Sequence, residues 1–316
     1  MSDRVALVFP GQGSQAVGMG REFFDRCGAA RALFEQADEI LGYKLSELCF
    51  NGPEDRLKQT IHTQPALYVA AAAAFVAGRD AGLRADFAAG HSLGEYTALF
   101  AAGVFDFETG LRLVRARAEA MQQCAERHPG AMAAVMGLEG ERTAAVCAQA
   151  AAETGAPVQP ANFNAPDQVV ISGAAAAVER ACSLAKDAGA RRALPLPVSG
   201  AFHSPLMNDA AEAMRRALQD AVLAPPAIRF INNVDADFLS DPADIKESLA
   251  RQITGSVKWC DAVQRLSEAG AGVFIEVGPG RVLQGLIRRI VPAAKVLGAG
   301  TPAELDATLN ELRSMR

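Results

Sequence analysis

The sequence predicts an α/β fold into which a smaller subdomain is inserted. Short apolar runs alternate with helical stretches along most of the chain, which is typical of helices packed on a sheet. Residues 129–198 follow a different pattern, and the alternation resumes after them. With 316 residues, half of them hydrophobic, the chain can bury one large core and a smaller second core. We therefore expect a main domain over residues 1–128 and 199–316 and an inserted subdomain over residues 129–198.

Apolar runs, and the residues that end them, indicate the elements of the main domain. Val5–Phe9 leads into Pro10-Gly11 and predicts a buried strand, with helices following to about Phe50. The Ala-rich run Ala66–Ala77 follows Pro65 and ends at Gly78, so it predicts a core helix and not a membrane span. The other predicted elements are a strand at Asp86–Ala89, a helical segment at Ser92–Ala102, an amphipathic helix from Phe107 to about Glu126, a strand at Arg229–Asn232, a helix at Asp244–Ile253, a strand at Phe274–Val277 and a helix at Val282–Ile290.

The inserted subdomain has the order βαββαβ, which is that of a ferredoxin-like unit. It follows the helix breaker His128-Pro129-Gly130, and the turn Ala165-Pro166-Asp167 separates its second and third strands. Its predicted elements are a strand at Ala131–Gly137, a helix at Glu141–Thr154, strands at Val158–Asn164 and Gln168–Ser172, a helix at Ala176–Ala188 and a strand at Arg192–Pro197.

The composition argues against several classes of function. The formal net charge is -5 and no run of Lys and Arg occurs, so the sequence offers no basic patch that would bind the phosphate backbone of a nucleic acid. The six cysteines show no CxxC spacing, which argues against a zinc site and a disulfide framework and favours a reducing compartment. The first apolar run is too short for a signal peptide. We therefore expect a cytoplasmic protein with no membrane partner.

The segment Gly90-His91-Ser92-Leu93-Gly94 is the candidate reactive site. In a Gly-x-Ser-x-Gly turn between a strand and a helix, the serine hydroxyl stands clear of the backbone, and the glycines remove side chains that would crowd the turn. Here the apolar Phe87-Ala88-Ala89 precedes the motif and a helix-compatible run follows it. Ser92 is therefore predicted to be a nucleophile that forms an acyl intermediate, with the amide of Leu93 facing the oxyanion. The alternative is a structural turn.

A serine nucleophile needs a base, and the chain has only four histidines. The side chain of His91, next to the serine, is expected to leave the turn in another direction. His128 belongs to the breaker loop, and His62 lies beside the predicted start of the Ala-rich helix, where a solvated or capping role is more usual. His203 follows the last strand of the insertion and can face a cleft between the two units. We predict that His203 is the base, and the alternative is an ordinary loop histidine.

The loop Gly11-Gln12-Gly13-Ser14-Gln15-Ala16 follows the first strand and has two interpretations. G-x-G-x-x-A after a strand is also a dinucleotide-binding fingerprint. Pro10 in the turn and the helix-breaking Gly18-Met19-Gly20 weaken that interpretation. At the carboxyl edge of a parallel sheet, the loop can instead direct the amide of Gln12 to a substrate carbonyl as a second oxyanion donor.

Four motifs, in this order, resemble those of the malonyl-CoA:acyl carrier protein transacylases, and the resemblance covers nearly the whole chain. They are Gly11-Gln12-Gly13-Ser14-Gln15, Gly90-His91-Ser92-Leu93-Gly94-Glu95, Ala201-Phe202-His203-Ser204 and Glu276-Val277-Gly278-Pro279-Gly280. The resemblance implies an α/β-hydrolase-like core, with a parallel sheet, that carries a ferredoxin-like insertion. It also implies that a malonyl group moves from malonyl-CoA to the serine and then to the phosphopantetheine thiol of acyl carrier protein, for fatty acid or polyketide synthesis. We expect a monomer that uses no cofactor.

The resemblance implies a role for each residue that matches a family motif. In order of their part in the reaction, Ser92 matches the nucleophile, His203 the base, Gln252 the residue whose backbone carbonyl orients the histidine, Gln12 and Leu93 the oxyanion amides, Arg117 the arginine that clamps the malonyl carboxylate, Asn162 a position that lines the thioester channel and Phe202 a ring that leaves little room for a methyl branch. Arg115 is expected to be solvated on another face of the helix. A surface charge is the alternative for Arg117, and a structural turn for Asn162.

Acyl carrier proteins are acidic as a class, so the resemblance also implies a basic surface near the mouth of the cleft. The candidates are Lys186, Arg191, Arg192, Arg281, Arg288 and Arg289. Ordinary solvated charges are the alternative.

Two rival functions stay open at this point. A serine esterase or thioesterase shares the nucleophile and the base, but it normally orients the histidine with Asp or Glu and has no use for Arg117. A carrier-protein docking module with a dead site is the second rival, and the presence of both Ser92 and His203 argues against it.

Overall fold

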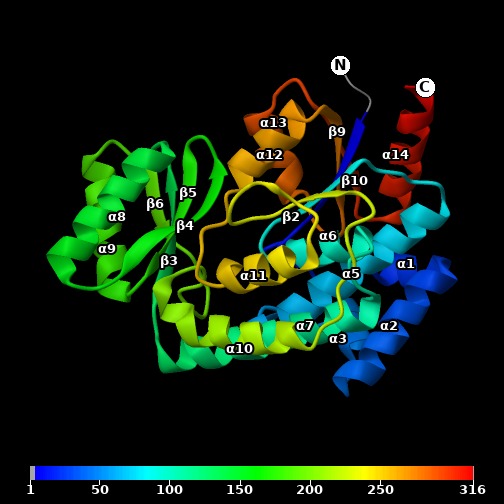
Figure 1. The fold of residues 1–316 in the computed structure, drawn as a ribbon, viewed down its shortest axis with the longest axis horizontal. Helices are drawn as coiled ribbons and strands as arrows, with labels where there is room; N and C mark the ends of the chain where they lie inside the picture. The colour runs from blue at the N-terminus through cyan, green and yellow to red at the C-terminus, as the bar shows by residue number, and fades with distance from the viewer. Residues whose placement is uncertain (1–3, 316) are drawn as a thin grey trace.

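The structure, a computed structural model, describes residues 4–315, which form two sheets with helices packed on them (Figure 1). The larger sheet has six strands in the order β10-β9-β1-β2-β7-β8, and the smaller sheet has four in the order β4-β5-β3-β6. The larger sheet is parallel apart from the pair β7 and β8, and the smaller sheet is antiparallel. The predicted α/β class, with a parallel sheet and a separate second sheet, is confirmed.

The larger sheet takes strands from both halves of the chain. Before the smaller sheet the elements are β1 (Arg4–Phe9), α1 (Arg21–Arg26), α2 (Gly28–Leu41), α3 (Leu45–Asn51), α4 (Glu54–Leu57), α5 (Thr60–Asp80), β2 (Phe87–Gly90), α6 (Gly94–Ala101) and α7 (Phe107–Arg127). After it they are a short 3-10 helix (Pro205–Met207), α10 (Asn208–Gln219), β7 (Arg229–Ile231), β8 (Phe238–Leu239), α11 (Pro242–Gln252), α12 (Trp259–Glu268), β9 (Ala271–Val277), α13 (Val282–Ile290), β10 (Lys295–Ala299) and α14 (Pro302–Ser314).

The side chains of β1 show why the larger sheet is buried on both faces. Successive side chains of a strand point to opposite faces. Val5, Leu7 and Phe9 join the core that includes residues of α2, α5 and α7, whereas Ala6 and Val8 join the core that includes residues of α12 and α13. Figure 1 shows α12 and α13 on one side of this sheet and α5, α6 and α7 on the other. An apolar central strand without polar alternation is what such a sandwich requires.

The Ala-rich helix is longer than predicted. It begins at Thr60, so Pro65 lies inside α5 and does not start it. The residues from Thr63 to Ala74 are all buried, and this packing outweighs the backbone hydrogen bond that the proline cannot make. His62 is consequently a residue of the helix, and the capping position is occupied by Gln59. Within residues 4–315, no helix, α5 included, is long and apolar enough to cross a membrane.

The smaller sheet and its two helices have the βαββαβ order that the sequence predicts. The elements are β3 (Ala131–Met136), α8 (Gly140–Thr154), β4 (Val158–Ala165), β5 (Gln168–Gly173), α9 (Ala175–Asp187) and β6 (Arg192–Pro195). They enclose a core of their own, which is formed mainly by side chains of the four strands and of α8 and α9. Figure 1 shows this unit beside the larger sheet. The boundaries at residues 129 and 198 stay a prediction, and the outer ends of the main domain, residues 1–3 and 316, lie outside the described residues.

Candidate active site

Ser92 lies in a tight turn between the end of β2 and the start of α6. Its φ is 51°, in the left-handed region that is strained for a serine. A Cβ on Gly90 would lie 1.9 Å from the carbonyl carbon of Gly94, and a Cβ on Gly94 would lie 2.1 Å from the carbonyl oxygen of Phe9. Only glycine fits at these two positions, which is the property that a nucleophile turn requires.

Asn233, two residues after β7, holds this turn in place. Its Oδ1 accepts a hydrogen bond from the backbone N–H of Ser92 at 2.7 Å, and its Nδ2 donates to the carbonyl oxygen of Gly90 at 2.6 Å. The side chain is buried. One amide therefore bridges both sides of the turn and stabilises the strained backbone of Ser92. The motifs gave no sign of this residue.

His203 is the histidine that contacts Ser92. Its Nε2 lies 2.8 Å from the Oγ of Ser92, and its Nδ1 lies 2.8 Å from the carbonyl oxygen of Gln252. A carbonyl oxygen only accepts, so Nδ1 carries the proton and Nε2 is free to accept one from the serine. Burial, and then the charge of Arg117, lower the pKa of His203 to about 3. The imidazole is therefore neutral at pH 7, as a general base must be.

Arg117, on α7, is buried next to the same serine. Its Nη1 donates to Oε1 of Gln64 at 2.6 Å, and its Nη2 donates to Oε1 of Gln252 at 2.9 Å and to Oγ of Ser92 at 3.1 Å. None of these acceptors is a carboxylate, and among residues 4–315 its Nε has no partner. Burial lowers the pKa of the guanidinium, which nevertheless stays charged at neutral pH. A buried cation without an anionic partner is suited to bind a carboxylate.

Arg115 behaves as the sequence predicts for a solvated arginine. Its guanidinium is exposed and pairs with Glu119 one turn further along α7, with Nε 2.8 Å from Oε1. Two arginines that are two positions apart on one helix therefore have opposite surroundings, because residues i and i+2 lie on different faces.

A cavity of about 560 Å³ brings the predicted site residues together. It is lined by Ser92, His203 and Arg117, by Gln12 and Leu93, and by Asn162 and Phe202. Among the described residues, the backbone N–H groups of Gln12 and Leu93 donate to no protein acceptor. Apolar side chains form much of the remaining wall, namely Met121, Met132, Met136, Val170, Leu196, Val198, Leu283 and Leu286. The structure thus gathers the predicted nucleophile, the predicted base, two free amides and a cation around one largely apolar cavity.

The other three histidines have partners of their own. His91 is half-buried, and its Nε2 lies 2.7 Å from Oδ1 of Asn164, in the smaller unit. His62 lies 3.3 Å from the hydroxyl of Tyr43. His128 is exposed and lies 3.4 Å from a carboxylate oxygen of Asp209. The prediction that His91 leaves the turn in another direction agrees with this contact.

Comparison with known proteins identifies the family. The model of the acyl transferase domain matches residues 6–302 of the chain. The chain belongs to the acyl transferase family. Among curated acyl transferases, the malonyl CoA-acyl carrier protein transacylase of Bacillus subtilis is 42% identical over 310 residues, which cover 98% of each chain. That of Escherichia coli K12 is 42% identical over 305 residues, 96% of this chain and 98% of the other.

Solved acyl transferase structures agree with this membership. The acyl-carrier-protein S-malonyltransferase of Burkholderia pseudomallei is 45% identical, has a TM-score of 0.93 and is matched over 97% of this chain and 99% of its own. A malonyl-transacylase solved in complex with a type II polyketide acyl carrier protein is 40% identical, with a TM-score of 0.94 over 98% and 99% of the two chains. The predicted resemblance to malonyl-CoA:acyl carrier protein transacylases is confirmed.

Of the basic residues predicted to face a carrier protein, some form ion pairs or hydrogen bonds within this acyl transferase and others do not. Arg191 and Arg289 both pair with Asp167, Arg281 pairs with Glu304, and Arg288 donates to Gln284 and to a backbone carbonyl. Lys186 and Arg192 are exposed and form no side-chain ion pair or hydrogen bond within residues 4–315. A basic docking surface therefore stays a prediction.

One group of side chains in the acyl transferase has the composition of a metal site. Ligand atoms of Cys124, His128 and Asp209 all lie within 4.8 Å of one another. The thiol of Cys124, however, donates to the carbonyl oxygen of Leu206 at 3.1 Å, and Asp209 pairs with Arg127 at 3.0 Å. Because an arginine already neutralises the one carboxylate of the group, we assign no metal to it.

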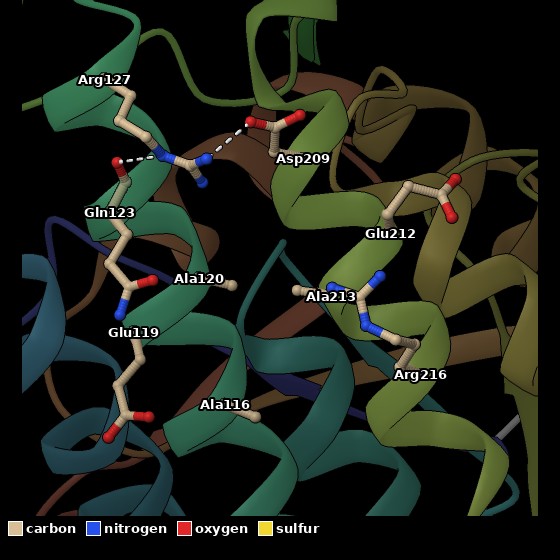
Figure 2. A pocket seen from close by; sticks show the side chains of 9 residues that line it. All are labelled: Ala116, Glu119, Ala120, Gln123, Arg127, Asp209, Glu212, Ala213 and Arg216. Atoms are coloured by element: carbon tan, nitrogen blue, oxygen red, sulfur yellow. Dashed lines mark hydrogen bonds and ion pairs between the residues drawn. The ribbon is translucent and has the colours of Figure 1, made fainter.

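A second hollow of about 480 Å³ is lined by residues of α7 and α10. Figure 2 shows that α7 contributes Glu119, Gln123 and Arg127 to it, and that Arg127 bonds both to the carbonyl oxygen of Gln123 and to Asp209 of α10. Alanines of both helices also line it, namely Ala116 and Ala120 of α7 and Ala213 of α10. None of the predicted catalytic residues of the acyl transferase lines this hollow.

Proposed function

We propose that this acyl transferase moves a malonyl group from malonyl-CoA to Ser92 and from there to the phosphopantetheine thiol of acyl carrier protein. The observation that carries the proposal is the contact between Ser92 and His203 beside a buried arginine that has no carboxylate partner. The family membership and the names of the relatives support the same reaction.

The first half of the reaction forms the acyl-serine. The hydroxyl of Ser92 attacks the thioester carbonyl while Nε2 of His203, 2.8 Å away, accepts its proton. The free amides of Gln12 and Leu93 stabilise the oxyanion, and each such donor contributes about 10² to 10³ in rate. His203 then gives the proton to the departing sulfur of CoA.

The carbonyl oxygen of Gln252 orients His203, a role that an acidic residue has in many serine hydrolases. By accepting the N–H of His203 at 2.8 Å, it fixes the tautomer and the orientation of the ring. The side chain of Gln252 is also bound, since its Nε2 donates to the carbonyl oxygen of Ser92 at 3.0 Å and its Oε1 accepts from Arg117. One residue thus positions the base, the nucleophile turn and the arginine.

Arg117 explains the choice of a dicarboxylic acyl group. The free carboxylate of malonyl would bind the guanidinium, whereas an acetyl group would leave the buried cation unpaired, which corresponds to roughly 10² to 10³ in discrimination. The ring of Phe202, which lines the same cavity, leaves little room for a methyl branch on the acyl carbon. Methylmalonyl is therefore a poor substrate in this proposal.

In the second half of the reaction, the phosphopantetheine thiol must attack the acyl-serine before water hydrolyses it. The largely apolar wall of the cavity favours this, because it limits the water that can reach the ester. The same wall accepts the long phosphopantetheine arm. One relative is named for polyketide biosynthesis and the others carry no pathway in their names, so either fatty acid or polyketide synthesis fits. A cytoplasmic location, a monomeric state and the lack of a cofactor stay predictions.

The test of this function compares Arg117→Ala with the matched control Arg115→Ala, two arginines of the same helix. Each protein is exposed briefly to malonyl-CoA, acetyl-CoA or methylmalonyl-CoA, and the acyl group added is measured by intact-mass spectrometry. Malonyl loading is expected to fall roughly 10² to 10³ in Arg117→Ala and to be unchanged in Arg115→Ala. Unchanged malonyl loading in Arg117→Ala, or hydrolysis of acetyl-CoA faster than malonyl transfer, would favour the esterase instead.

A further inference from the structure

Glu95 is a fully buried carboxyl group beside the reaction site that the proposed mechanism does not use. It lies in the first turn of α6, three residues after Ser92. Its Oε2 accepts hydrogen bonds from Nε2 of Gln252 at 2.6 Å and from the backbone N–H of Asn233 at 3.2 Å. Within residues 4–315 its Oε1 has no partner. Oε1 is therefore the oxygen that is free to take up a proton.

Gln252 links this carboxyl group to the arginine of the site. Its Nε2 donates to Glu95, and its Oε1 accepts from Nη2 of Arg117 at 2.9 Å. Both groups are almost fully buried, so the charges they carry are weakly screened. The charge on one therefore affects the protonation of the other through a single fixed amide.

Two charged side chains, Arg117 and Asp235, act on the pKa of Glu95. Arg117 on α7 favours the ionised carboxylate, and Asp235, after β7, disfavours it. Asp235 is itself paired at the surface with Arg251 of α11, and the nearby His203 is neutral. Burial is the largest effect and raises the pKa of Glu95 to about 8, against the opposing hydrogen bonds from Gln252 and Asn233.

A bound malonyl group adds a second negative charge to this arrangement. With Glu95 ionised, Arg117 would face two carboxylates in a region from which water is excluded, and the surplus charge would be costly. We propose that Glu95 is a positioning residue that takes up a proton from solvent when the malonyl carboxylate binds Arg117, so that malonyl loading is coupled to proton uptake. The inference rests on the proposed function, because it needs the malonyl carboxylate at Arg117.

The proton on Glu95 is separate from the one that moves in the transfer. Malonyl-CoA and Ser92 give the malonyl ester and free CoA, and the proton of the serine passes through His203 to the sulfur of CoA. The Glu95 proton enters from solvent and leaves when the malonyl group departs. A protonated Glu95 still accepts from Gln252 through Oε2, so the arginine keeps its place in both states. Malonyl loading is therefore weakened as the pH rises above about 8, and it does not change further with pH below about 8, where Glu95 is already protonated before malonyl binds.

The test measures protons taken up per malonyl-enzyme formed, at about pH 9 and about pH 6.5. A pH-indicator dye in weakly buffered solution reports the protons, intact-mass spectrometry reports the malonyl-enzyme, and a titration of free CoA supplies the correction for its thiol. Wild type should take up close to one proton at pH 9 and close to none at pH 6.5, where Glu95 is already protonated. The control Glu119→Gln, on the exposed face of α7, should behave as wild type, and Glu95→Gln should take up close to none at either pH.

The wild-type comparison between the two pH values decides the question even if Glu95→Gln does not fold. A malonyl adduct on wild type without proton uptake at pH 9 would overturn this inference and leave the proposed function intact. Uptake in Glu95→Gln equal to that of wild type would also overturn it. The lack of any malonyl adduct would overturn the proposed function, and the inference with it.

Discussion

His203 combines burial with proximity to a cation, and both keep its imidazole neutral. Because its pKa is lowered to about 3, we predict that kcat/KM for malonyl transfer stays flat between pH 5 and pH 7. A pH-rate profile with malonyl-CoA, measured over that range, checks this. A histidine with its ordinary pKa would instead give an inflection near about 6.5, with activity lost on the acid side. That inflection would contradict the environment described for His203.

The lowered pKa of His203 also makes the free energy of unfolding depend on pH. The unfolded chain binds a proton at this histidine below about pH 6.5, whereas the folded chain does not until about pH 3. The contribution of His203 to the free energy of unfolding is therefore present above about pH 6.5 and is lost as the pH falls toward 3. Urea unfolding of wild type and His203→Gln at pH 7 and pH 5 measures it. Wild type should lose more stability than the variant over this interval, and equal losses would contradict the shift.

Single residues with a motif could be placed from the sequence, and those without one could not. Ser92, His203 and Arg117 each stand in a recognisable segment, and the structure brings His203 and Arg117 within hydrogen-bond reach of Ser92, although their roles stay proposals. Gln64, Asn164 and Asn233 were missed. Asn233 acts on Gly90, 143 positions earlier in the chain, and no local pattern encodes so distant a contact. Its only signal was a polar pair, Asn232-Asn233, at the end of a predicted strand.

The turn between β2 and α6 depends on the absence of side chains. In Gly94→Ala the new Cβ would lie 2.1 Å from the carbonyl oxygen of Phe9, which is backbone and cannot move aside without shifting β1. We predict a loss of about 1–3 kcal/mol in the free energy of unfolding, together with slower malonyl loading. The control is Gly28→Ala at the start of α2, where a Cβ meets nothing within 4 Å. Denaturant unfolding measures both, and equal stability of the two variants would contradict the role given to Gly94.

Elements with strong periodicity could be predicted closely, and weakly patterned ones were missed. The predicted helix Val282–Ile290 has the observed bounds of α13, because its apolar residues recur at helical spacing and Gly278-Pro279-Gly280 precedes it. The strand β10 was missed because it lies at the edge of its sheet and four of its five residues are only half-buried, which leaves no clear alternation. The helices α10, α12 and α14 were missed as well.

The smaller unit and the larger one meet at the loop that carries His203, the proposed base. Nε2 of Gln159, on β4, donates to the carbonyl oxygens of His203 and Thr254, each at 2.9 Å. Because Gln159→Ala leaves these two acceptors unpaired, we predict a loss of about 1–3 kcal/mol in the free energy of unfolding and a lower rate of malonyl loading. The control is Gln149→Ala, on the exposed face of α8. Unchanged loading in Gln159→Ala would contradict a structural role for the smaller unit in holding His203.

The arrangement of the whole molecule is the part that the sequence leaves most open. Alternation predicted an α/β core and an inserted βαββαβ unit, but it did not predict that β1 lies between β9 and β2 in the larger sheet. Strand order depends on contacts between segments that are hundreds of residues apart, here Val5 beside Val273. The cavity itself arises only from that order, since it collects residues of both units.

The most direct measurement follows one malonyl group through both half-reactions. Wild type and Ser92→Ala are mixed with malonyl-CoA, the intact mass is recorded, the modified peptide is located by fragmentation, and holo-acyl carrier protein is then added. We predict that wild type gains one malonyl group on Ser92 and loses it as the carrier protein gains the same mass, while Ser92→Ala gains none. A malonyl adduct on Ser92→Ala, or transfer to the carrier protein without a loaded enzyme, would contradict the acyl-serine on which the account rests.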